Sequence, residues 1–231
     1  MSMMSMSVWN KADVLVAGGG AAGMMAAIAA AERGARVMLF EKNDRLGKKL
    51  YITGKGRCNV TNDCAPEEFF QNVPRNPRFL YSSIYAFPPR DVMAWFEARG
   101  CPLKTERGNR VFPQSDKSAS VIDALRAELR RLGVRVCHED VQALLMQDGA
   151  VTGLRTQLGS YDGAVILATG GCSYPQTGST GDGYRLAASA GHTIVPPVGS
   201  LVPLVEKGHD CKQMQGLALK NVELRLVNQK K

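Results

Sequence analysis

The sequence contains no pair of cysteines at the spacing of a metal site or a redox motif. Its six cysteines are scattered over 231 residues without a C-x-x-C pair, which argues against both a zinc site and a disulfide framework. No apolar run approaches the roughly 18 residues of a membrane span. The opening stretch MSMMSMSVWN lacks the basic start and the apolar run of a secretory signal. We therefore expect a cytoplasmic protein with reduced thiols, no bound metal and no membrane partner.

Histidine is also scarce, and the three histidines show no mutual spacing typical of a metal site or a catalytic triad. The composition that remains, 45% apolar and 22% charged, is that of a globular chain able to bury a core. The net charge of +8 admits nucleic acid or phosphorylated ligands as partners. Much of this charge falls in one short region, which contains Arg33, Arg36, Lys42, Arg45, Lys48, Lys49, Lys55 and Arg57.

A strand, glycine turn and helix stand near the start of the chain, in ADVLVAGGGAAGMMAAIAAAERGARVMLFEKN. The apolar run at 12–17 predicts a buried parallel strand. Gly18, Gly20 and Gly23 follow in G-x-G-x-x-G spacing, for a tight turn, a close approach of pyrophosphate and helix-on-strand packing. The alanine-rich segment 24–33 predicts a helix whose N-terminus faces the phosphates, and Ala21 and Ala22 lie in that turn.

A second strand at 35–40 ends at Glu41, eighteen residues after Gly23. A carboxylate at this place can accept hydrogen bonds from both ribose hydroxyls of an adenosine. Its charge repels a 2′-phosphate, so the pattern favours the adenosine of FAD or NAD over that of NADP. The motif alone leaves FAD and NAD both open.

Four further stretches carry a resemblance to a known family: GKKLYITGKGRCNVTN, GNRVFPQSDKSASVIDAL, VILATGGCSYPQTGSTGDGYRLAASAGHTI and LVPL. They resemble the BaiN/YhiN-like NAD(P)/FAD-dependent oxidoreductases, over residues 12–226. That family is similar in its flavin domain to the fumarate reductase flavoproteins, and its members include aminoacetone oxidases and bile-acid reductases. The resemblance implies an α/β, Rossmann-like FAD/NAD(P)-binding fold of the fumarate-reductase/glutathione-reductase type, with FAD as the cofactor.

The resemblance also implies roles for the glycine-rich basic loop at 47–62. Gly54 and Gly56 let the backbone approach the flavin end of the cofactor, and Arg57 stabilises the anionic reduced flavin. Cys58 and Asn59 fall where the family motif lines the cleft. The alternative interpretation makes Cys58 a core filler and the lysines of the loop a solvated face.

A second fingerprint is the strand AVILATGG, which returns to the cofactor near its pyrophosphate. By the resemblance, the chain near Val141 touches adenine through its backbone. Thr180 is expected to cap a helix whose first turn holds Asp182, either beside the flavin or as a capping carboxylate only. The full set of expected cofactor-binding residues is Gly18, Gly20, Ala21, Ala22, Gly23, Glu41, Lys42, Gly47, Lys49, Gly56, Arg57, Cys58, Asn59, Val141, Thr169, Gly170, Gly171 and Asp182.

The domain plan predicted from the sequence has two parts. Residues 1–196 form the FAD-binding domain, with a largely helical insertion at about 65–133 that includes helices at 90–99 and 118–132. Asp148-Gly149 and Asp162-Gly163 are predicted turns between strands. Residues 197–231 begin a β-rich substrate domain, with strands around 201–205 and 219–227. Relatives in the family continue for over a hundred further residues, so we expect an N-terminal fragment with weak or no activity alone.

The expected function is hydride transfer through FAD between a reduced donor, NADH or NADPH, and a small organic substrate. No side chain is compelling as a catalytic acid or base. A flavin-dependent RNA-modifying protein and a non-catalytic FAD-binding fragment remain alternatives. We expect no nucleic-acid partner, because the basic residues cluster at the cofactor and are not interleaved with aromatic residues. The sequence does not predict the oligomeric state.

Overall fold

A computed structural model of the chain describes residues 10–199, 205–219, 222–223 and 225. Its contacts divide the chain into two units, Met1–Val195 and Pro196–Lys231, which are considered separately. In the second unit the described residues form one short helix, α7 (Asp210–Gln213). The strands predicted around 201–205 and 219–227 fall mostly outside the described residues, and a substrate domain beginning at 197 stays a prediction.

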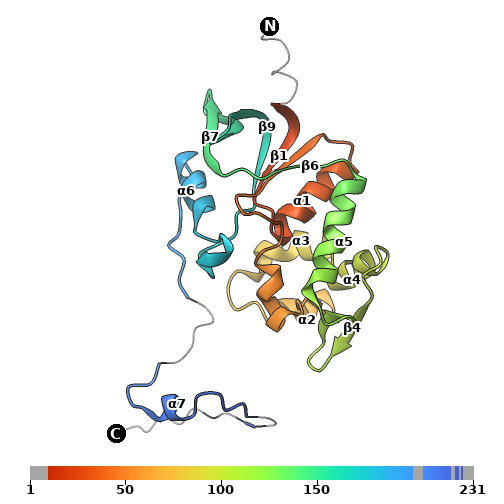
Figure 1. The fold of residues 1–231 in the computed structure, drawn as a ribbon, viewed down its shortest axis with the longest axis vertical. Coiled ribbons are helices and arrows are strands. Elements are labelled where there is room, and N and C mark those ends of the chain that lie inside the picture. The colour runs from red at the N-terminus through yellow and green to blue at the C-terminus, as the bar shows by residue number, and fades with distance from the viewer. Residues whose placement is uncertain (1–9, 200–204, 220–221, 224, 226–231) are drawn as a thin grey trace. The chain divides into compact units, whose positions relative to one another are not determined.

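The first unit is built on a six-stranded sheet with the strand order β6-β2-β1-β9-β8-β7 (Figure 1). The parallel part contains β6 (Arg135–Cys137), β2 (Val37–Phe40), β1 (Lys11–Ala17) and β9 (Ser160–Leu167). The antiparallel part adds β8 (Ala150–Thr156) and β7 (Val141–Gln147) at one edge. All four residues of β2 are buried, as expected of a strand covered on both faces.

Two helices, α1 (Ala21–Glu32) and α5 (Ser118–Arg131), lie side by side against the parallel strands (Figure 1). Their packing buries Ile28, Leu39, Leu125 and Leu129 almost completely. The other core cluster contains Leu186 of α6 (Asp182–Ser189). The parallel strands with their covering helices confirm the predicted α/β, Rossmann-like fold.

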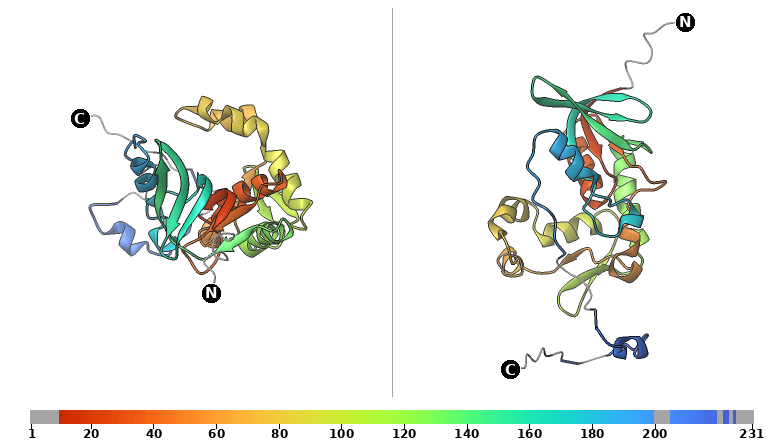
Figure 2. Two further views of the ribbon diagram at one scale, coloured as in Figure 1. Left: turned by 90° about the horizontal axis from the view of Figure 1, so that it is seen from above. Right: turned by 90° about the vertical axis from the view of Figure 1, so that its left-hand side faces the viewer.

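A small antiparallel sheet with the order β3-β5-β4 adds to this fold, apart from the main sheet (Figure 2). Its strands are β3 (Thr61–Asn62), β5 (Arg110–Pro113) and β4 (Leu103–Glu106). The helices near it are α2 (Pro66–Gln71), α3 (Tyr81–Ala86) and α4 (Pro89–Glu97), and three 3₁₀ segments complete the unit: η1 (Leu50–Gly56), η2 (Pro77–Leu80) and η3 (Pro175–Thr177). The predicted insertion at 65–133 is therefore helical with two strands inside it.

Two local predictions are wrong. Gly163 lies within β9 and makes no turn; the chain turns at 157–159, where Thr156 N donates to Gly159 O (2.8 Å). Gly163 is needed because a Cβ there would collide with the carbonyl oxygen of Ala12 in the neighbouring strand. Thr180 does not cap α6, because the cap residue is Gly181 and no side chain bonds to the helix end. The predicted turn at Asp148-Gly149 is confirmed between β7 and β8.

A buried carboxylate joins α5 to the segment that follows α4. Glu128, which is 5% exposed, accepts hydrogen bonds from Arg131 (2.8 and 2.9 Å) and from Arg99 (2.9 Å). The bonds from Arg131 are the main cause that lowers the pKa of Glu128 to about 2, with Arg99 adding to the effect. The folded state therefore favours the ionised carboxylate.

The pH dependence of stability follows from this lowered pKa. Because the folded pKa lies below the unfolded one, the contribution is present above about pH 4.5 and is lost as the pH falls toward 2. We expect wild type to have a larger free energy of unfolding than Glu128→Gln. The difference between the two should decrease by about 3 kcal/mol at most as the pH falls from 4.5 toward 2. Urea unfolding of both proteins from pH 7 to pH 2.5 measures the difference, and a difference independent of pH would contradict this role.

Candidate cofactor site

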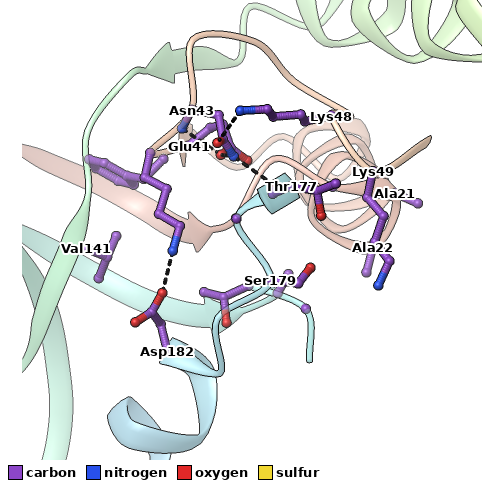
Figure 3. Close-up of a pocket in the computed structure, with 18 of the residues that line it drawn as sticks. Ala21, Ala22, Glu41, Asn43, Lys48, Lys49, Val141, Thr177, Ser179 and Asp182 are labelled. Carbon is purple, nitrogen blue, oxygen red and sulfur yellow. Dashed lines mark hydrogen bonds and ion pairs between the residues drawn. The ribbon is translucent and has the colours of Figure 1, made fainter. Parts of the chain in front are cut away.

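A cavity of about 290 Å³ lies where the carboxyl ends of β1, β2 and β9 meet. Figure 3 shows residues from several distant parts of the chain around it. Its lining comes from five regions of the sequence: 18–22, 40–53, 139–141, 168–170 and 177–182. In open parallel sheets this edge is the usual place for a ligand.

The N-terminus of α1 forms one wall of the cavity. Gly18 has φ of +106°, which lets the chain turn sharply from β1 into the helix. The helix begins at Ala21 after Gly20, and no side chain caps its first amides. A Cβ at Gly20 would meet no protein atom within 4 Å, so the space in front of the amides is open. Free N–H groups and the helix dipole together make a site for an anion such as phosphate.

Gly23 serves packing and does not line the cavity. A Cβ at this position would collide with the carbonyl oxygen of Gly18, so only glycine lets the helix lie this close to the strand. The cavity and the packing thus depend on different glycines of the same motif.

Glu41 at the end of β2 stands on the wall of the cavity and is 8% exposed. Its Oε2 accepts a hydrogen bond from Gly19 N (2.8 Å). Its Oε1 accepts from Asn43 N (2.8 Å) and from Asn43 Nδ2 (2.6 Å). A carboxylate has about four acceptor positions, so these three bonds fix its orientation and leave capacity for a ligand hydroxyl.

Asn43 is a lining residue that the sequence did not reveal. Besides Glu41, its Nδ2 donates to Thr177 O (3.2 Å), and its Oδ1 accepts from Lys48 Nζ (3.3 Å). The amide thereby ties the segment after β2 to the loop after β9. The one available signal was its place two residues after Glu41, whereas Thr177 is distant in sequence.

Asn43→Ala should weaken FAD binding about tenfold, because Glu41 loses a side-chain hydrogen bond that orients it; bonds to charged groups are worth about 1.5–3 kcal/mol. Titration of FAD into both proteins by calorimetry measures the change. Asn72→Ala removes an exposed amide that donates to Glu68 O and serves as the matched control. Equal loss of affinity in both variants would show that Asn43 does not position the carboxylate.

An ion pair crosses from β2 to α6. Lys42 Nζ lies 2.6 Å from Asp182 Oδ2 and donates to Thr180 Oγ1 (2.8 Å), as Figure 3 shows for the ion pair. Hydrogen bonds from Lys42 and then Thr180 lower the pKa of Asp182. On the opposite wall, Lys49 Nζ donates to Ser173 Oγ (2.6 Å). Both lysines are therefore held at the cavity by partners more than a hundred residues away.

The chain near Val141, where we predicted the contact with adenine, is held by a buried network of hydrogen bonds. Glu139 accepts hydrogen bonds from Tyr161 Oη (2.9 and 3.0 Å) and from Thr156 Oγ1 (2.6 Å). Burial and then the bond to Glu139 raise the pKa of Tyr161 to about 12. The network fixes the start of β7, where Val141 lines the cavity.

One lining residue carries a buried polar atom without a partner. Thr169 Oγ1 makes no hydrogen bond within the described part of the chain. A buried hydroxyl left unsatisfied costs about 1–3 kcal/mol. The oxygen has almost no exposed surface, and a Cβ at Gly183 would lie 2.5 Å from it, so it packs against the start of α6.

The structure brings together most of the residues predicted to bind the cofactor and separates the others. The cavity is lined by Gly18, Gly20, Ala21, Ala22, Glu41, Lys42, Lys49, Val141, Thr169, Gly170 and Asp182. The predicted residues outside its lining are Gly23, Gly47, Gly56, Arg57, Cys58, Asn59 and Gly171. Residues that line it without having been predicted as cofactor-binding include Asn43, Thr53, Glu139, Thr177 and Ser179.

The glycine-rich basic loop is thus divided. Its first half reaches the cavity through Lys48, Lys49, Leu50 and Thr53. In the second half, Cys58 is 2% exposed, and burial raises the pKa of its thiol. Gly47 donates its N–H to Gly19 O (2.9 Å), and Gly56 has φ of +84° within the turn of the loop.

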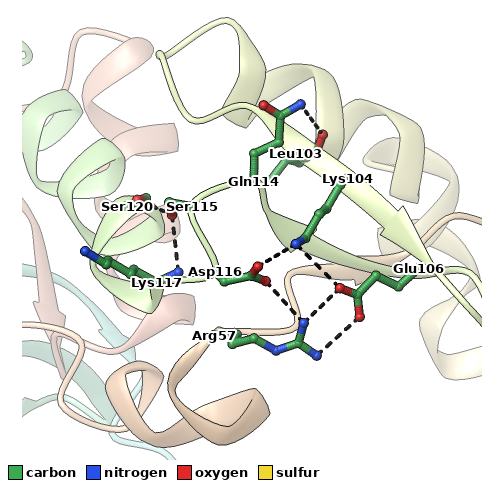
Figure 4. A network of polar contacts seen from close by, with 9 residues as sticks. All are labelled: Arg57, Leu103, Lys104, Glu106, Gln114, Ser115, Asp116, Lys117 and Ser120. Atoms are coloured by element: carbon green, nitrogen blue, oxygen red, sulfur yellow. Dashed lines mark hydrogen bonds and ion pairs between the residues drawn. The ribbon is translucent and has the colours of Figure 1, made fainter.

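Arg57 belongs to a network of charges on the small sheet (Figure 4). Its guanidinium binds Glu106 with two bonds (2.8 and 3.2 Å), contacts Asp116 (3.2 Å) and stacks on Phe112, 4.0 Å from the ring centroid. Lys104 also contacts Asp116 (2.6 Å). Glu106 and Asp116 therefore offset the positive charge of Arg57. The predicted role of this charge, to stabilise reduced flavin, stays a prediction.

Asn59 and Gly171 are held by neighbouring backbone. In the orientation that satisfies its amide, Asn59 donates to the carbonyl oxygens of Thr61 (3.0 Å) and Val111 (3.1 Å). It thereby joins β3 to β5. Gly171 O accepts from Gly181 N (3.2 Å), which fixes the loop before α6.

Comparison with known proteins decides the family. Residues 12–231 match the family described as HI0933-like protein Rossmann domain. The chain belongs to this HI0933-like family. Its members are FAD-dependent oxidoreductases with a Rossmann domain, which confirms the predicted family and agrees with a dinucleotide cavity at the carboxyl ends of the strands.

Relatives with assigned activities share this domain. The chain is 38% identical to the 3-dehydro-bile acid delta(4,6)-reductase of Clostridium scindens, over 87% of this chain and 49% of the relative. It is 28% identical to the ribosomal RNA dihydrouridine synthase of Haemophilus influenzae, over 85% of this chain and 49% of the relative. The chain thus spans about half the length of the curated relatives it matches.

A solved structure supports the fold independently. The open conformation of a flavocytochrome c3 fumarate reductase matches with a TM-score of 0.64 and 27% identity, over 79% of this chain and 41% of that one. The predicted similarity to the fumarate reductase flavoproteins is confirmed.

The cavity residues fit FAD in its adenosine and pyrophosphate portions. The uncapped helix amides suit the pyrophosphate, and the Glu41 carboxylate suits the ribose. Among the described residues, no group of histidine, cysteine or acidic side chains could hold a metal ion, and no helix has the length and apolar character to cross a membrane.

Proposed function

We propose that this chain binds the ADP half of FAD in the cavity at the ends of β1, β2 and β9. The observation that carries the proposal is the open, uncapped helix N-terminus at Gly20 facing a buried carboxylate at Glu41. A pyrophosphate at the amides and a ribose at the carboxylate satisfy both groups. An unphosphorylated ribose is required, because a 2′-phosphate beside Glu41 would meet like charge.

The chain's own groups have distinct tasks in this proposal. The N-terminus of α1 orients the pyrophosphate, and Asn43 holds Glu41 in place for the ribose. Val141 offers its backbone to adenine. Lys42 and Asp182 neutralise each other across the cavity, and Lys49 adds positive charge near the phosphates. No catalytic acid or base is assigned.

FAD, when bound, supplies hydride transfer, and we propose NADH or NADPH as the donor and a small organic molecule as the acceptor. The reductase from Clostridium scindens supports a small organic substrate, since it is the more similar of the two relatives compared above. The donor and the substrate of the whole protein both belong to the proposal, because the chain spans half of such relatives.

An anaerobic reduction experiment tests this function. The FAD-loaded chain is mixed with NADH or NADPH, and loss of the oxidised flavin band is followed by stopped flow. We expect the chain alone to be reduced slowly, as predicted for a fragment. A version extended with the C-terminal region of the Clostridium scindens reductase should be reduced at least tenfold faster than free FAD with one donor and reoxidised by an unsaturated 3-dehydro-bile acid. Reduction of the extended protein no faster than that of free FAD with both donors would contradict the proposed oxidoreductase function.

Reduction of ribosomal RNA is a second candidate function. The ribosomal RNA dihydrouridine synthases of Haemophilus influenzae and Escherichia coli match over 85% and 89% of this chain, and the net charge of +8 suits a phosphate backbone. Binding of ribosomal RNA fragments that weakens steeply with salt, together with dihydrouridine formation by the FAD-loaded protein, would favour it. RNA binding that neither weakens steeply with salt nor leads to dihydrouridine formation would count against this function.

A further inference from the structure

A second cavity, of about 210 Å³, adjoins the segment that follows β2. Residues 44–46 line it, directly after residues 40–43 that line the first cavity. Its other walls come from the last turns of α5 and from β6 and the residues around that strand. The site lies wholly within the first unit of the chain.

Four basic groups converge on this cavity: Arg45, Arg126, Arg130 and His138. Arg126 and Arg130 are four residues apart on α5, so they lie on one face of the helix. Arg45 approaches from the segment after β2, and His138 from the end of β6. Asp44 is the one carboxylate among the lining residues, so the lining carries an excess of positive charge.

The charges of these arginines are poorly compensated within the described chain. Arg126 has one carboxylate, Asp123, at 3.8 Å. Arg45 stacks over the ring of Tyr51 at 5.0 Å, and no ion pair within the described residues involves Arg45 or Arg130. By contrast, the neighbouring Arg131 is bound by Glu128 at 2.8 Å. The helix dipole at the C-terminal end of α5 stabilises the positive charge of Arg130. It does not explain why three arginines and His138 line the same cavity.

The floor of the cavity is apolar and well packed. Leu46, Leu129 and Val134 line it with exposed fractions of 6%, 1% and 9%. An apolar floor beneath a rim of arginines matches an organic molecule with an anionic group at one end. Guanidinium groups suit a phosphate or carboxylate because they can bind two of its oxygens at once.

We propose that this cavity is a binding site for a small organic anion, separate from the FAD site. Its phosphate or carboxylate contacts Arg126 and Arg130, and its apolar body rests on Leu129 and Val134. A small molecule is favoured over a nucleic acid, because the basic groups surround one concave site and do not follow a strip. His138 Nδ1 also bonds to Asn43 O (2.8 Å), so a ligand here contacts the segment that positions Glu41.

Calorimetric titration with phenyl phosphate tests the proposal. The chain, saturated with FAD so that the first cavity is filled, is titrated at low ionic strength with phenyl phosphate, inorganic phosphate and phenol. We expect one phenyl phosphate per chain, at least fivefold weaker binding of inorganic phosphate, and no binding of phenol. Arg126→Gln/Arg130→Gln should weaken phenyl phosphate at least tenfold and leave FAD affinity unchanged.

Arg75→Gln/Arg78→Gln is the matched control, because both arginines are exposed, line neither cavity and carry the same change in charge. Circular dichroism checks the fold of each variant. If Arg126→Gln/Arg130→Gln does not fold, the single variant Arg126→Gln is used in its place. No saturable binding, or an equal effect of the two variant pairs, would overturn the site. Tighter binding of oligouridylate than of phenyl phosphate, lost in the same cavity variant, would overturn the assignment to a small molecule.

Discussion

Gly20→Val is expected to abolish FAD binding while leaving the free protein folded. The backbone at Gly20, with φ of −78°, is open to any residue, and a Cβ there would meet no protein atom within 4 Å. The side chain would instead occupy the space in front of the uncapped amides of α1. We expect the loss of affinity to exceed a hundredfold, measured by calorimetry, with the unfolding temperature of the free protein unchanged.

Gly23→Val is the matched control and should have the opposite effects. Its Cβ would collide with the carbonyl oxygen of Gly18, so α1 could no longer pack on β1. We expect a loss of several kcal/mol of stability or failure to fold, seen by circular dichroism without any ligand. FAD binding by a folded Gly20→Val protein as tight as that of wild type would show that the pyrophosphate does not lie at this helix.

Glu41→Ala is expected to lower FAD affinity at least tenfold. The variant lacks the acceptor for a ribose hydroxyl, and a hydrogen bond to a charged group is worth about 1.5–3 kcal/mol. The free protein should also lose stability, because the amides of Gly19 and Asn43 lose their partner. Binding is therefore measured by calorimetry under conditions in which circular dichroism shows both proteins fully folded.

A ligand without the ribose hydroxyls separates these two effects. ADP should bind wild type at least tenfold more tightly than Glu41→Ala, whereas 2′,3′-dideoxy-ADP should bind both proteins alike. Glu97→Ala removes an exposed carboxylate of α4 and should change neither affinity. An equal loss for ADP and for its dideoxy form would mean that Glu41 acts on the fold and not on the ribose.

The elements that the sequence predicted well are those with a local cause. The apolar strand, the glycine spacing after it and the acid after the next strand all fall within residues 12–41. All of them lie at the cavity or pack beside it. The amphipathic helix at Ser118–Arg131 likewise follows from its own periodicity. Such features depend on neighbours within a few residues, so a single sequence shows them.

The elements that it missed depend on contacts between distant segments. Asn43 became a lining residue because its amide meets Thr177, 134 positions away. The role of Arg57 at the flavin stays a prediction, but its partners were not foreseen, because the pairing of β5 with β4 brings Glu106 and Asp116 to its guanidinium. Gly163 read as a turn because glycine often ends strands, whereas here the close approach of β1 requires it. None of these pairings has a periodic signal in the sequence.

Competition for the FAD site tests the central claim most directly. FAD is titrated into the purified chain, and the titration is repeated in the presence of saturating ADP and of saturating FMN. Because the described cavity supplies the contacts for adenosine and pyrophosphate, one FAD should bind per chain, ADP should displace it competitively, and FMN should not. Displacement by FMN but not by ADP, or FAD binding that Gly20→Val leaves intact, would contradict the account.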